Sequence, residues 1–211
     1  MPTFQQQFSQ AWRKLLPQFS SEHWSVEQHE RCLEKLLHAY QEPQRAYHQL
    51  QHIVECLALF EKVQSQIEDG FALQLAIFFH DVVYQPRRSV SNEQDSALWM
   101  RQQLAAALPE TQLDKIANWI LATQQHATTS DSDLAYLLDI DLAILGSSPQ
   151  RFAEYQQQIR QEYAWVDELI YQEKRHAVLR QFYLTQPLYQ TRYFQQHYEQ
   201  QAKTNLLQAL D

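Results

Sequence analysis

Apolar side chains recur every three or four positions along almost the whole chain, which is the spacing of residues on one face of an α-helix. The first such pattern, from Phe4 to Leu16, ends near Pro17, and a second extends from Val26 to Tyr40. The same period predicts further helices at about residues 47–66, 92–108, 110–126, 133–145, 149–163, 167–184 and 190–210. The pattern therefore predicts an all-α fold.

The segment Phe71–Tyr84 is apolar on nearly every side, so we expect it to be the buried central helix. Gly70 separates it from the preceding helix, and a loop of residues 85–91 follows it. Among the remaining boundaries, the sequence offers Ser91 or Asn92 as a helix cap, Gly146 as a C-cap, and Ser148 with Pro149 as a helix start. No internal repeat or linker interrupts the pattern, which predicts a single domain over residues 1–211.

Composition narrows the classes of function. Only 2 of the 211 residues are glycine, which excludes binding sites that depend on Gly-rich phosphate loops or dinucleotide fingerprints. The formal net charge is −8 and no run of Lys and Arg is longer than two residues, so long nucleic acid is a poor partner. A mononucleotide or a short oligonucleotide remains compatible with this charge.

The cysteines and the hydropathy of the chain indicate in which cellular compartment the protein is expected. Cys32 and Cys56 occupy core positions of helical patterns and are predicted to be reduced, not paired in a disulfide. The N-terminal residues lack the apolar stretch of a signal peptide, and no segment approaches 18 consecutive apolar residues. We therefore expect a cytoplasmic protein that makes no use of a membrane.

The dipeptide His80-Asp81 ends the apolar run LQLAIFF. A charged carboxylate in apolar surroundings costs several kcal/mol unless a cation or strong donors accompany it. A divalent metal would supply that charge, and imidazole is its commonest protein ligand. The alternative is a helix C-terminus where His80 caps carbonyl groups and Asp81 meets water.

Two other segments carry residues of the same kind. His48 and His52 are four residues apart, which predicts that they share one helical face. Asp139 and Asp141 lie in an apolar helix. Asp141 is closer to the helix face that carries the core leucines, whereas Asp139 is assigned to the solvent-exposed face. A helical bundle uses such imidazoles and carboxylates on separate helices to build a metal site in its core.

The order Tyr-His-x-x-x-His, then His-Asp, then Asp in an apolar helix resembles the HD-domain metal-dependent phosphohydrolase superfamily, and within it a bacterial group of predicted HD phosphohydrolases. The similar stretches are EPQRAYHQLQHI, FFHDVVYQP, NEQDSA, LATQQH, LDIDLAILG and IRQEY. The resemblance implies an HD-domain-like helical bundle whose metal-site core spans about residues 40–145, with C-terminal helices at about 149–210.

Cyclic-nucleotide phosphodiesterases share that fold, and their motifs imply roles for residues of this chain. The metal ligands would be His52, His80, Asp81 and Asp141. His48 would be the general acid that protonates the leaving oxygen, and Glu93 would hold metal-bound water, so that His48, Asp81 and Glu93 form the catalytic set. Gln49 stands where those enzymes have Asn, and their long nucleotide pocket has no counterpart here, which weakens cyclic nucleotides as substrates.

Further polar residues are candidates for supporting roles. His126 would be a ligand of a second metal ion or a partner of a ligand, or else simply a histidine at a helix end. Arginines that could grip a phosphate are Arg45, Arg87, Arg88, Arg160 and Arg175. Arg87 and Arg88 have the best claim because their loop follows the His80-Asp81 dipeptide.

The function expected from these residues is metal-dependent hydrolysis of a phosphate ester of a small phosphorylated metabolite, most simply a nucleotide. The cofactor would be a divalent ion: Mn, Fe, Ni, Co, Zn or Mg. Two alternatives are a non-catalytic metal-containing nucleotide sensor and a di-iron oxygenase of the HD type. The aromatic C-terminal helices would pack either within the chain or against a second copy, so the sequence is also compatible with a homodimer.

Overall fold

The computed structural model describes residues 2–20, 22–87 and 91–210. Within these ranges the regular elements are α-helices and short 3-10 helices, and none is a strand. The predicted all-α class is therefore confirmed. The chain divides into two compact units, Met1–Ala127 and Thr128–Asp211. The expectation of one domain stays a prediction.

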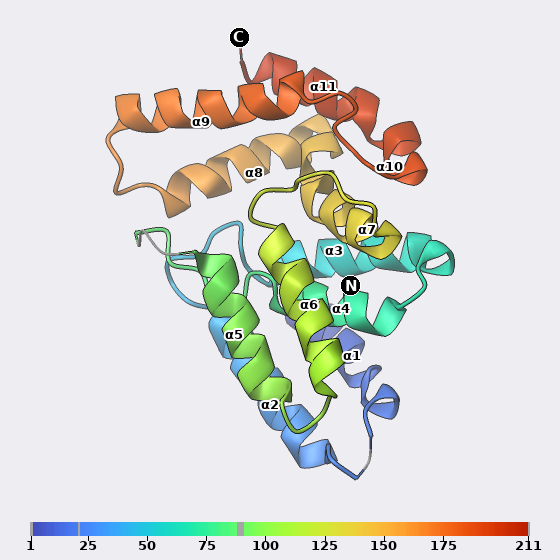
Figure 1. The fold of residues 1–211 in the computed structure, drawn as a ribbon. Helices are drawn as coiled ribbons and strands as arrows, with labels where there is room; N and C mark the ends of the chain where they lie inside the picture. Colours follow the sequence, from blue (N-terminus) through green and yellow to red (C-terminus); the bar gives the residue numbers. More distant parts are fainter. Residues whose placement is uncertain (1, 21, 88–90, 211) are drawn as a thin grey trace. The chain divides into compact units, whose positions relative to one another are not determined.

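Six α-helices and two 3-10 helices form the described part of the first unit. They are α1 (Phe4–Arg13), η1 (Leu16–Gln18), α2 (Val26–Ala39), α3 (Leu50–Val63), η2 (Gln64–Gln66), α4 (Gly70–Phe79), α5 (Asn92–Leu104) and α6 (Glu110–Ala122). α4 contacts α3, α5 and α6, and α5 and α6 lie side by side in Figure 1. Ser91 caps α5 through its side chain, as predicted.

α4 is the central helix of this unit, because its residues from Leu75 to Phe79 are all fully buried. Gly70 begins this helix, and Asp69 caps it by accepting a hydrogen bond from the backbone of Ala72. The predicted central helix extended to Tyr84, whereas α4 ends at Phe79. The apolar run from 71 to 84 is thus correctly assigned to the core, but its last residues are not helical.

The end of α4 has partners for each of its last four carbonyl groups, which helix geometry leaves without intrahelical donors. The backbone N–H of His80 donates to Ala76, and the ring Nδ1 of His80 donates to Ile77 at 3.0 Å. The Tyr40 hydroxyl donates to Phe78 at 2.9 Å, and the Val82 N–H donates to Phe79. These contacts explain why the helix can stop inside the core without glycine or proline.

A buried polar network connects α1 and α2. Trp12 donates through Nε1 to the carbonyl of His29, and the His29 ring donates through Nε2 to the carbonyl of Trp12. The remaining nitrogen, Nδ1 of His29, accepts from Nε1 of Trp24 at 3.0 Å. His29 is fully buried, and desolvation lowers its pKa. Its role is therefore structural.

The second unit is also helical in its described part. It contains α7 (Ser132–Leu142), η3 (Ala143–Gly146), α8 (Pro149–Glu162), α9 (Glu168–Leu184), α10 (Arg192–His197) and α11 (Glu199–Gln208). Ser148 caps α8 and Pro149 is its first residue, as predicted. α9 and α11 lie side by side (Figure 1).

Two expectations for this unit were wrong. The helix predicted at 190–210 is two helices, which meet at Tyr198 with φ −124° and ψ −28°. Gly146 does not adopt the left-handed conformation of a C-cap glycine. Instead, a Cβ at Gly146 would lie 2.7 Å from the carbonyl oxygen of Tyr198, so glycine is needed for close packing against the junction of α10 and α11.

The two cysteines occupy core positions, as predicted. Cys32 and Cys56 are buried and free, and burial raises the pKa of the Cys32 thiol to about 12. Among the described residues, no helix combines the length and the apolar character needed to cross a membrane.

Candidate metal centre

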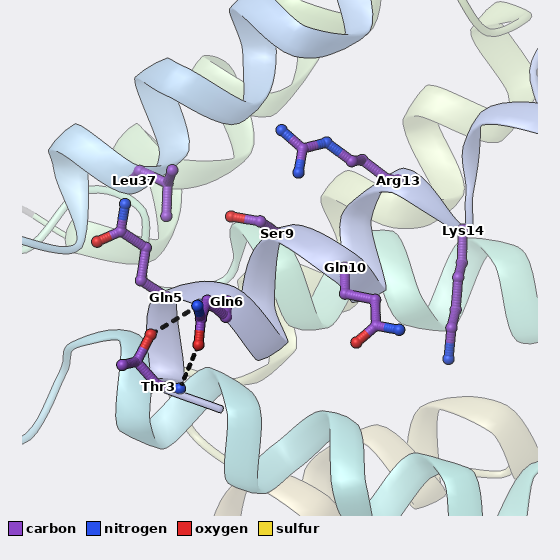
Figure 2. A pocket seen from close by; sticks show the side chains of 8 residues that line it. All are labelled: Thr3, Gln5, Gln6, Ser9, Gln10, Arg13, Lys14 and Leu37. Carbon is purple, nitrogen blue, oxygen red and sulfur yellow. Dashed lines mark hydrogen bonds between the residues drawn. The ribbon is translucent and has the colours of Figure 1, made fainter. Parts of the chain in front are cut away.

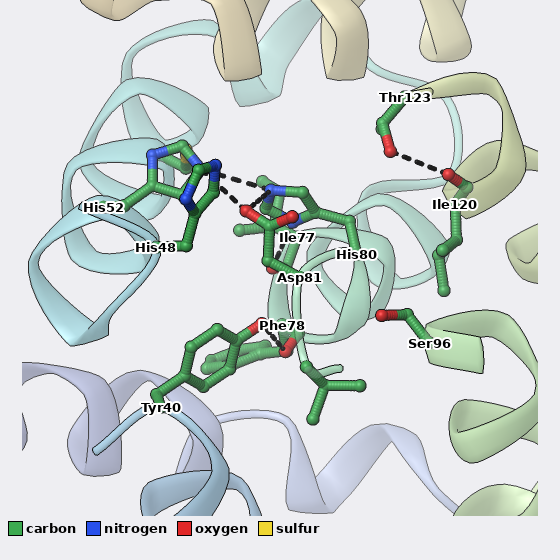
Figure 3. A network of polar contacts seen from close by, with 12 residues as sticks. Tyr40, His48, His52, Ile77, Phe78, His80, Asp81, Ser96, Ile120 and Thr123 are labelled. Atoms are coloured by element: carbon green, nitrogen blue, oxygen red, sulfur yellow. Dashed lines mark hydrogen bonds and ion pairs between the residues drawn. The ribbon is translucent and has the colours of Figure 1, made fainter. Parts of the chain in front are cut away.

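Three polar side chains of the first unit converge at the end of α4. His80 and Asp81 directly follow this helix, and His52 lies in the first turn of α3. The Nε2 atoms of His52 and His80 are 3.1 Å apart, and the Asp81 Oδ2 atom lies 3.0 Å from His80 Nε2 and 3.5 Å from His52 Nε2. Figure 3 shows the three side chains pointing toward one another. Both imidazoles are buried.

The hydrogen bond of His80 to Ile77 fixes which ring nitrogen faces this cluster. A carbonyl oxygen only accepts, so Nδ1 of His80 carries the proton. In neutral His80 the lone pair of Nε2 is then directed at His52 and Asp81. Metal-binding histidines commonly hold their ring in this way, with the other N–H donated to a backbone carbonyl. The arrangement orients His80 as a ligand.

The separations also fit a metal coordination sphere. Ligand atoms about 2.1 Å from one metal ion lie about 3.0 Å apart at a right angle and about 3.4 Å apart at the tetrahedral angle. The distances among His52, His80 and Asp81 match these values. Within the described part of the first unit, His52, His80 and Asp81 offer ligand atoms close enough together to hold a metal ion. The coarse prediction of a His and Asp metal-binding group is therefore supported.

The charge of Asp81 is stabilised by its neighbours. Burial by itself would raise the pKa of this carboxyl, but the positive charges of His80, His48 and His52 in their protonated forms, with the hydrogen bond that protonated His80 donates, lower it well below its usual range. Asp81 therefore stays a carboxylate at neutral pH. A negatively charged oxygen beside two imidazole nitrogens is a ligand set typical of divalent transition metals.

His48 is near this group but not on the helix that was predicted for it. α3 begins at Leu50, and His48 lies in the turn before it, so His48 and His52 do not share a helical face. Their ring centroids are 6.2 Å apart, and the His48 ring stacks on Tyr84 at 4.2 Å. His48 is half-buried. The turn thus brings His48 beside the cluster while leaving part of it accessible.

Arg45 does not have the role suggested for it, because its guanidinium is occupied inside the protein. It donates to the carbonyls of His48, Asp81 and Val82, each at 2.8 Å, and to the Glu42 carboxylate at 3.4 Å. Its side chain is fully buried and its charge lies over the Tyr40 ring. Arg45 therefore holds the backbone on both sides of the cluster, and its guanidinium is not free to bind a phosphate.

Other residues that fix the segment after Asp81 were not found by sequence reasoning. Ser96 of α5 accepts from the Val83 N–H and donates back to the Val83 carbonyl, and Gln44 donates to the carbonyl of Tyr84. Cys56 lies one helical turn beyond His52, with Sγ 3.7 Å from His52 Nδ1. Serine, glutamine and cysteine in these patterns carry no sequence signal that separates them from ordinary helix residues.

The predicted supporting residues have varied surroundings. Glu93 is in the first turn of α5 and accepts a hydrogen bond from the Ser91 hydroxyl at 2.8 Å. Arg87 is exposed, and Arg88 lies outside the described residues. His126 follows the end of α6 with φ 49°, and its N–H donates to Ala122. This backbone conformation fits a residue that ends a helix. The catalytic, phosphate-binding and second-metal roles of these four residues stay predictions.

The two acidic residues of α7 are placed differently from each other. Asp139 was assigned to the wet face, but it is only 1% exposed, so that assignment was wrong. It accepts hydrogen bonds from the N–H groups of Gln190 and Thr191 and from the Thr191 hydroxyl. Burial raises the Asp139 pKa to about 6, against the opposing effect of these donors. Asp141, the predicted ligand, is half-buried in the same helix.

Two cavities of the first unit lie outside the cluster, among the residues that the structure describes. One, of about 800 Å³, is lined by polar side chains of α1 and of the residues that flank it, together with Leu37 of α2, as Figure 2 shows. None of the predicted site residues lines it. A second cavity of about 500 Å³ is lined by residues 82–85, directly after Asp81, and by Trp99 of α5. This second cavity adjoins the segment that positions the cluster.

Comparison of the chain with models of protein families, with curated proteins and with solved structures gives no significant match. The resemblance to the HD-domain superfamily therefore stays a prediction that rests on the sequence motifs.

Proposed function

We propose that this protein is a metal-dependent phosphohydrolase that cleaves a phosphate ester of a small metabolite, most simply a nucleotide. The convergence of His52 Nε2, His80 Nε2 and Asp81 Oδ2 within 3.0–3.5 Å of one another carries the proposal. His52, His80 and Asp81 would hold the ion, and Asp141, predicted from the sequence, would be the fourth ligand.

A divalent ion in this site would lower the pKa of a water ligand toward about 7 and polarise a phosphoryl oxygen. Asp81 keeps its negative charge at neutral pH and so balances part of the charge of the ion. His80 is oriented by Ile77, and the backbone at Asp81 is held by Arg45. The protein therefore presents ligands whose positions are set before the ion binds.

His48 is the residue best placed to move a proton in this reaction. It is half-buried, stacked on Tyr84 and next to His52, and its backbone is fixed by Arg45. As a general acid, His48 would donate a proton to the oxygen of the departing group when the ester bond breaks. Proton donation of this kind contributes on the order of 10²–10⁴ to the rate.

The first experiment compares the metal content of the wild-type protein with that of His80→Ala and Asp81→Ala, by elemental analysis after purification and after loading with Mn, Ni, Zn or Mg. We expect about one to two equivalents in the wild type and loss in both variants. The matched control is His23→Ala, since His23 is an exposed histidine of the same unit. It should keep its metal.

Hydrolytic activity is then measured on p-nitrophenyl phosphate, on bis(p-nitrophenyl) phosphate and on a panel of nucleotides. We expect hydrolysis to disappear in His80→Ala and Asp81→Ala, and His48→Ala to keep its metal while losing about 10²-fold or more of its rate. Retained hydrolysis in Asp81→Ala would contradict the proposal. Tight nucleotide binding without turnover would favour the sensor alternative, and oxygen consumption with bound iron would favour the oxygenase.

A further inference from the structure

The long helix α9 buries little of its surface within the second unit. Of its 17 residues, only Leu179 is buried. Leu169 is 75% exposed and Leu184 is 64% exposed, although both are large apolar residues near the two ends of the helix. These two leucines give α9 exposed apolar area near each end, which a partner of matching shape could cover.

Six of the exposed residues of α9 lie on one side of the helix and form a continuous stripe. At 3.6 residues per turn, the six side chains concerned fall within an arc of about 100°, and all of them are exposed. They are Leu169, Glu173, His176, Ala177, Arg180 and Leu184. A shallow groove of about 670 Å³ follows most of this stripe. We call these six residues the α9 stripe.

The α9 stripe is self-complementary about its midpoint, between His176 and Ala177. Counting outward from that point pairs Glu173 with Arg180 and Leu169 with Leu184. In a two-fold symmetric contact a residue i meets residue j of the other copy, and j meets i. An antiparallel pair of α9 helices would therefore place opposite charges together twice and leucines together twice.

The charged pair of the stripe is available for such a contact. Other charged residues of α9 are engaged within the unit: Glu168 with Arg160, and Arg175 with Gln156. Within the part of the chain that the structure describes, Glu173 and Arg180 form no such ion pair. Ala177, at the midpoint, has a small side chain that lets two helices approach closely.

We propose that α9 pairs antiparallel with α9 of a second copy of this chain, about a two-fold axis between His176 and Ala177. The leucines at both ends supply apolar burial, and the Glu173–Arg180 pairs set the direction and register of the helices. The paired segment from Leu169 to Leu184 is about 22 Å long at 1.5 Å per residue. The inference is independent of the proposed function.

Sedimentation equilibrium on the full-length protein tests the pairing. We expect a dimer for the wild type, a weakening of the dimer by about tenfold or more in Glu173→Arg and in Arg180→Glu, and recovery in the double variant Glu173→Arg/Arg180→Glu. Lys174→Glu changes the charge by as much as Arg180→Glu but lies outside the stripe. It should leave the dimer unchanged.

A cross-linking measurement makes the result independent of dimer strength. Ala177→Cys places a thiol beside the axis, while Cys32 and Cys56 are buried. We expect a disulfide-linked dimer of Ala177→Cys under mild oxidation, and none for Lys174→Cys. The proposal would be overturned if the wild-type protein stayed monomeric at every soluble concentration. It would also be overturned if the protein formed a dimer that the charge substitutions left unchanged and if Ala177→Cys gave no cross-link. Circular dichroism verifies that each variant is folded.

Discussion

Arg45 acts on the cluster through the backbone. Its guanidinium bonds the carbonyls of His48, Asp81 and Val82, and its charge lies over the Tyr40 ring. A planar fork with five donors can join several carbonyl groups that face different directions, which an ammonium group cannot do as well. Arg45 was selected from the sequence as a phosphate ligand because of its charge, and only its partners reveal its role in positioning His48 and Asp81.

His29 shows how burial decides the protonation state of a histidine. Its Nδ1 accepts a hydrogen bond from Trp24, which is possible only when the ring is neutral. Desolvation lowers the pKa of His29 in the folded protein below its ordinary value of 6.5. At pH values between the folded pKa and 6.5, the unfolded chain therefore binds more protons than the folded one. Stability is therefore complete above about pH 6.5 and is lost as the pH falls.

We predict that the free energy of unfolding decreases on acidification from pH 7 to pH 5, and that part of this decrease is absent in His29→Gln. Protonation of His29 would leave the Trp24 N–H without its acceptor, at a cost of about 1–3 kcal/mol. Urea unfolding at several pH values measures the effect, with His23→Gln as the exposed control. An NMR titration that gives His29 a pKa of 6.5 or higher would contradict the prediction.

At the scale of elements, the ends of helices position the chemistry. α4 stops at Phe79 because side chains of His80 and Tyr40 satisfy two of its final carbonyl groups, and the chain can then turn so that Asp81 faces His80. α3 starts at Leu50, which leaves His48 in a turn. The apolar period locates both helices correctly, but it does not contain the contacts that end them.

α7 offers a contrast between a structural and a predicted metal-binding carboxylate two residues apart. We predict that Asp139→Ala lowers the free energy of unfolding by about 3 kcal/mol or more, because buried donors of Gln190 and Thr191 lose their acceptor, each costing about 1–3 kcal/mol. Asp141→Ala should instead lower metal content with a smaller effect on the metal-free protein. Chemical unfolding in EDTA and elemental analysis measure the two quantities.

One combination of results for these two variants would contradict the prediction. If Asp141→Ala keeps its metal and Asp139→Ala keeps its stability, the assignment of the two carboxylates is wrong. Since Asp139 is anchored to residues 190 and 191 of its own unit, its effect should also appear in the unfolding of that unit.

At the scale of the whole molecule, binding of a metal ion by the folded state alone must stabilise the protein. We predict that Mn, Ni or Zn at about 100 times its dissociation constant adds about 2.7 kcal/mol and raises the melting temperature by roughly 5–10 °C. Thermal unfolding with and without the ion measures the shift, and EDTA should reverse it. An equal shift in His80→Ala would show that the ion binds elsewhere.

The sequence by itself determines the all-α class, the positions of most helices, the buried character of α4 and the candidate ligands His52, His80 and Asp81. The fold class, the helix positions and the burial of α4 follow from helical periodicity, and His80 with Asp81 follows from the cost of burying a carboxylate, which are both local properties of the chain. The choice of His52 as a ligand comes from the resemblance of its motif to the HD-domain superfamily. The same local rules indicate which helix carries Asp141, but not which of its two carboxylates is buried in a network of donors.

The tertiary structure decides the features that depend on partners distant in sequence. It assigns Arg45 to the backbone around the cluster, buries Asp139 against Thr191, places His48 in a turn and divides the last predicted helix at Tyr198. Each of these depends on a hydrogen bond or a close packing contact across the fold. Periodicity and composition record the burial of a residue, whereas its hydrogen-bond partner is fixed only when the elements pack together.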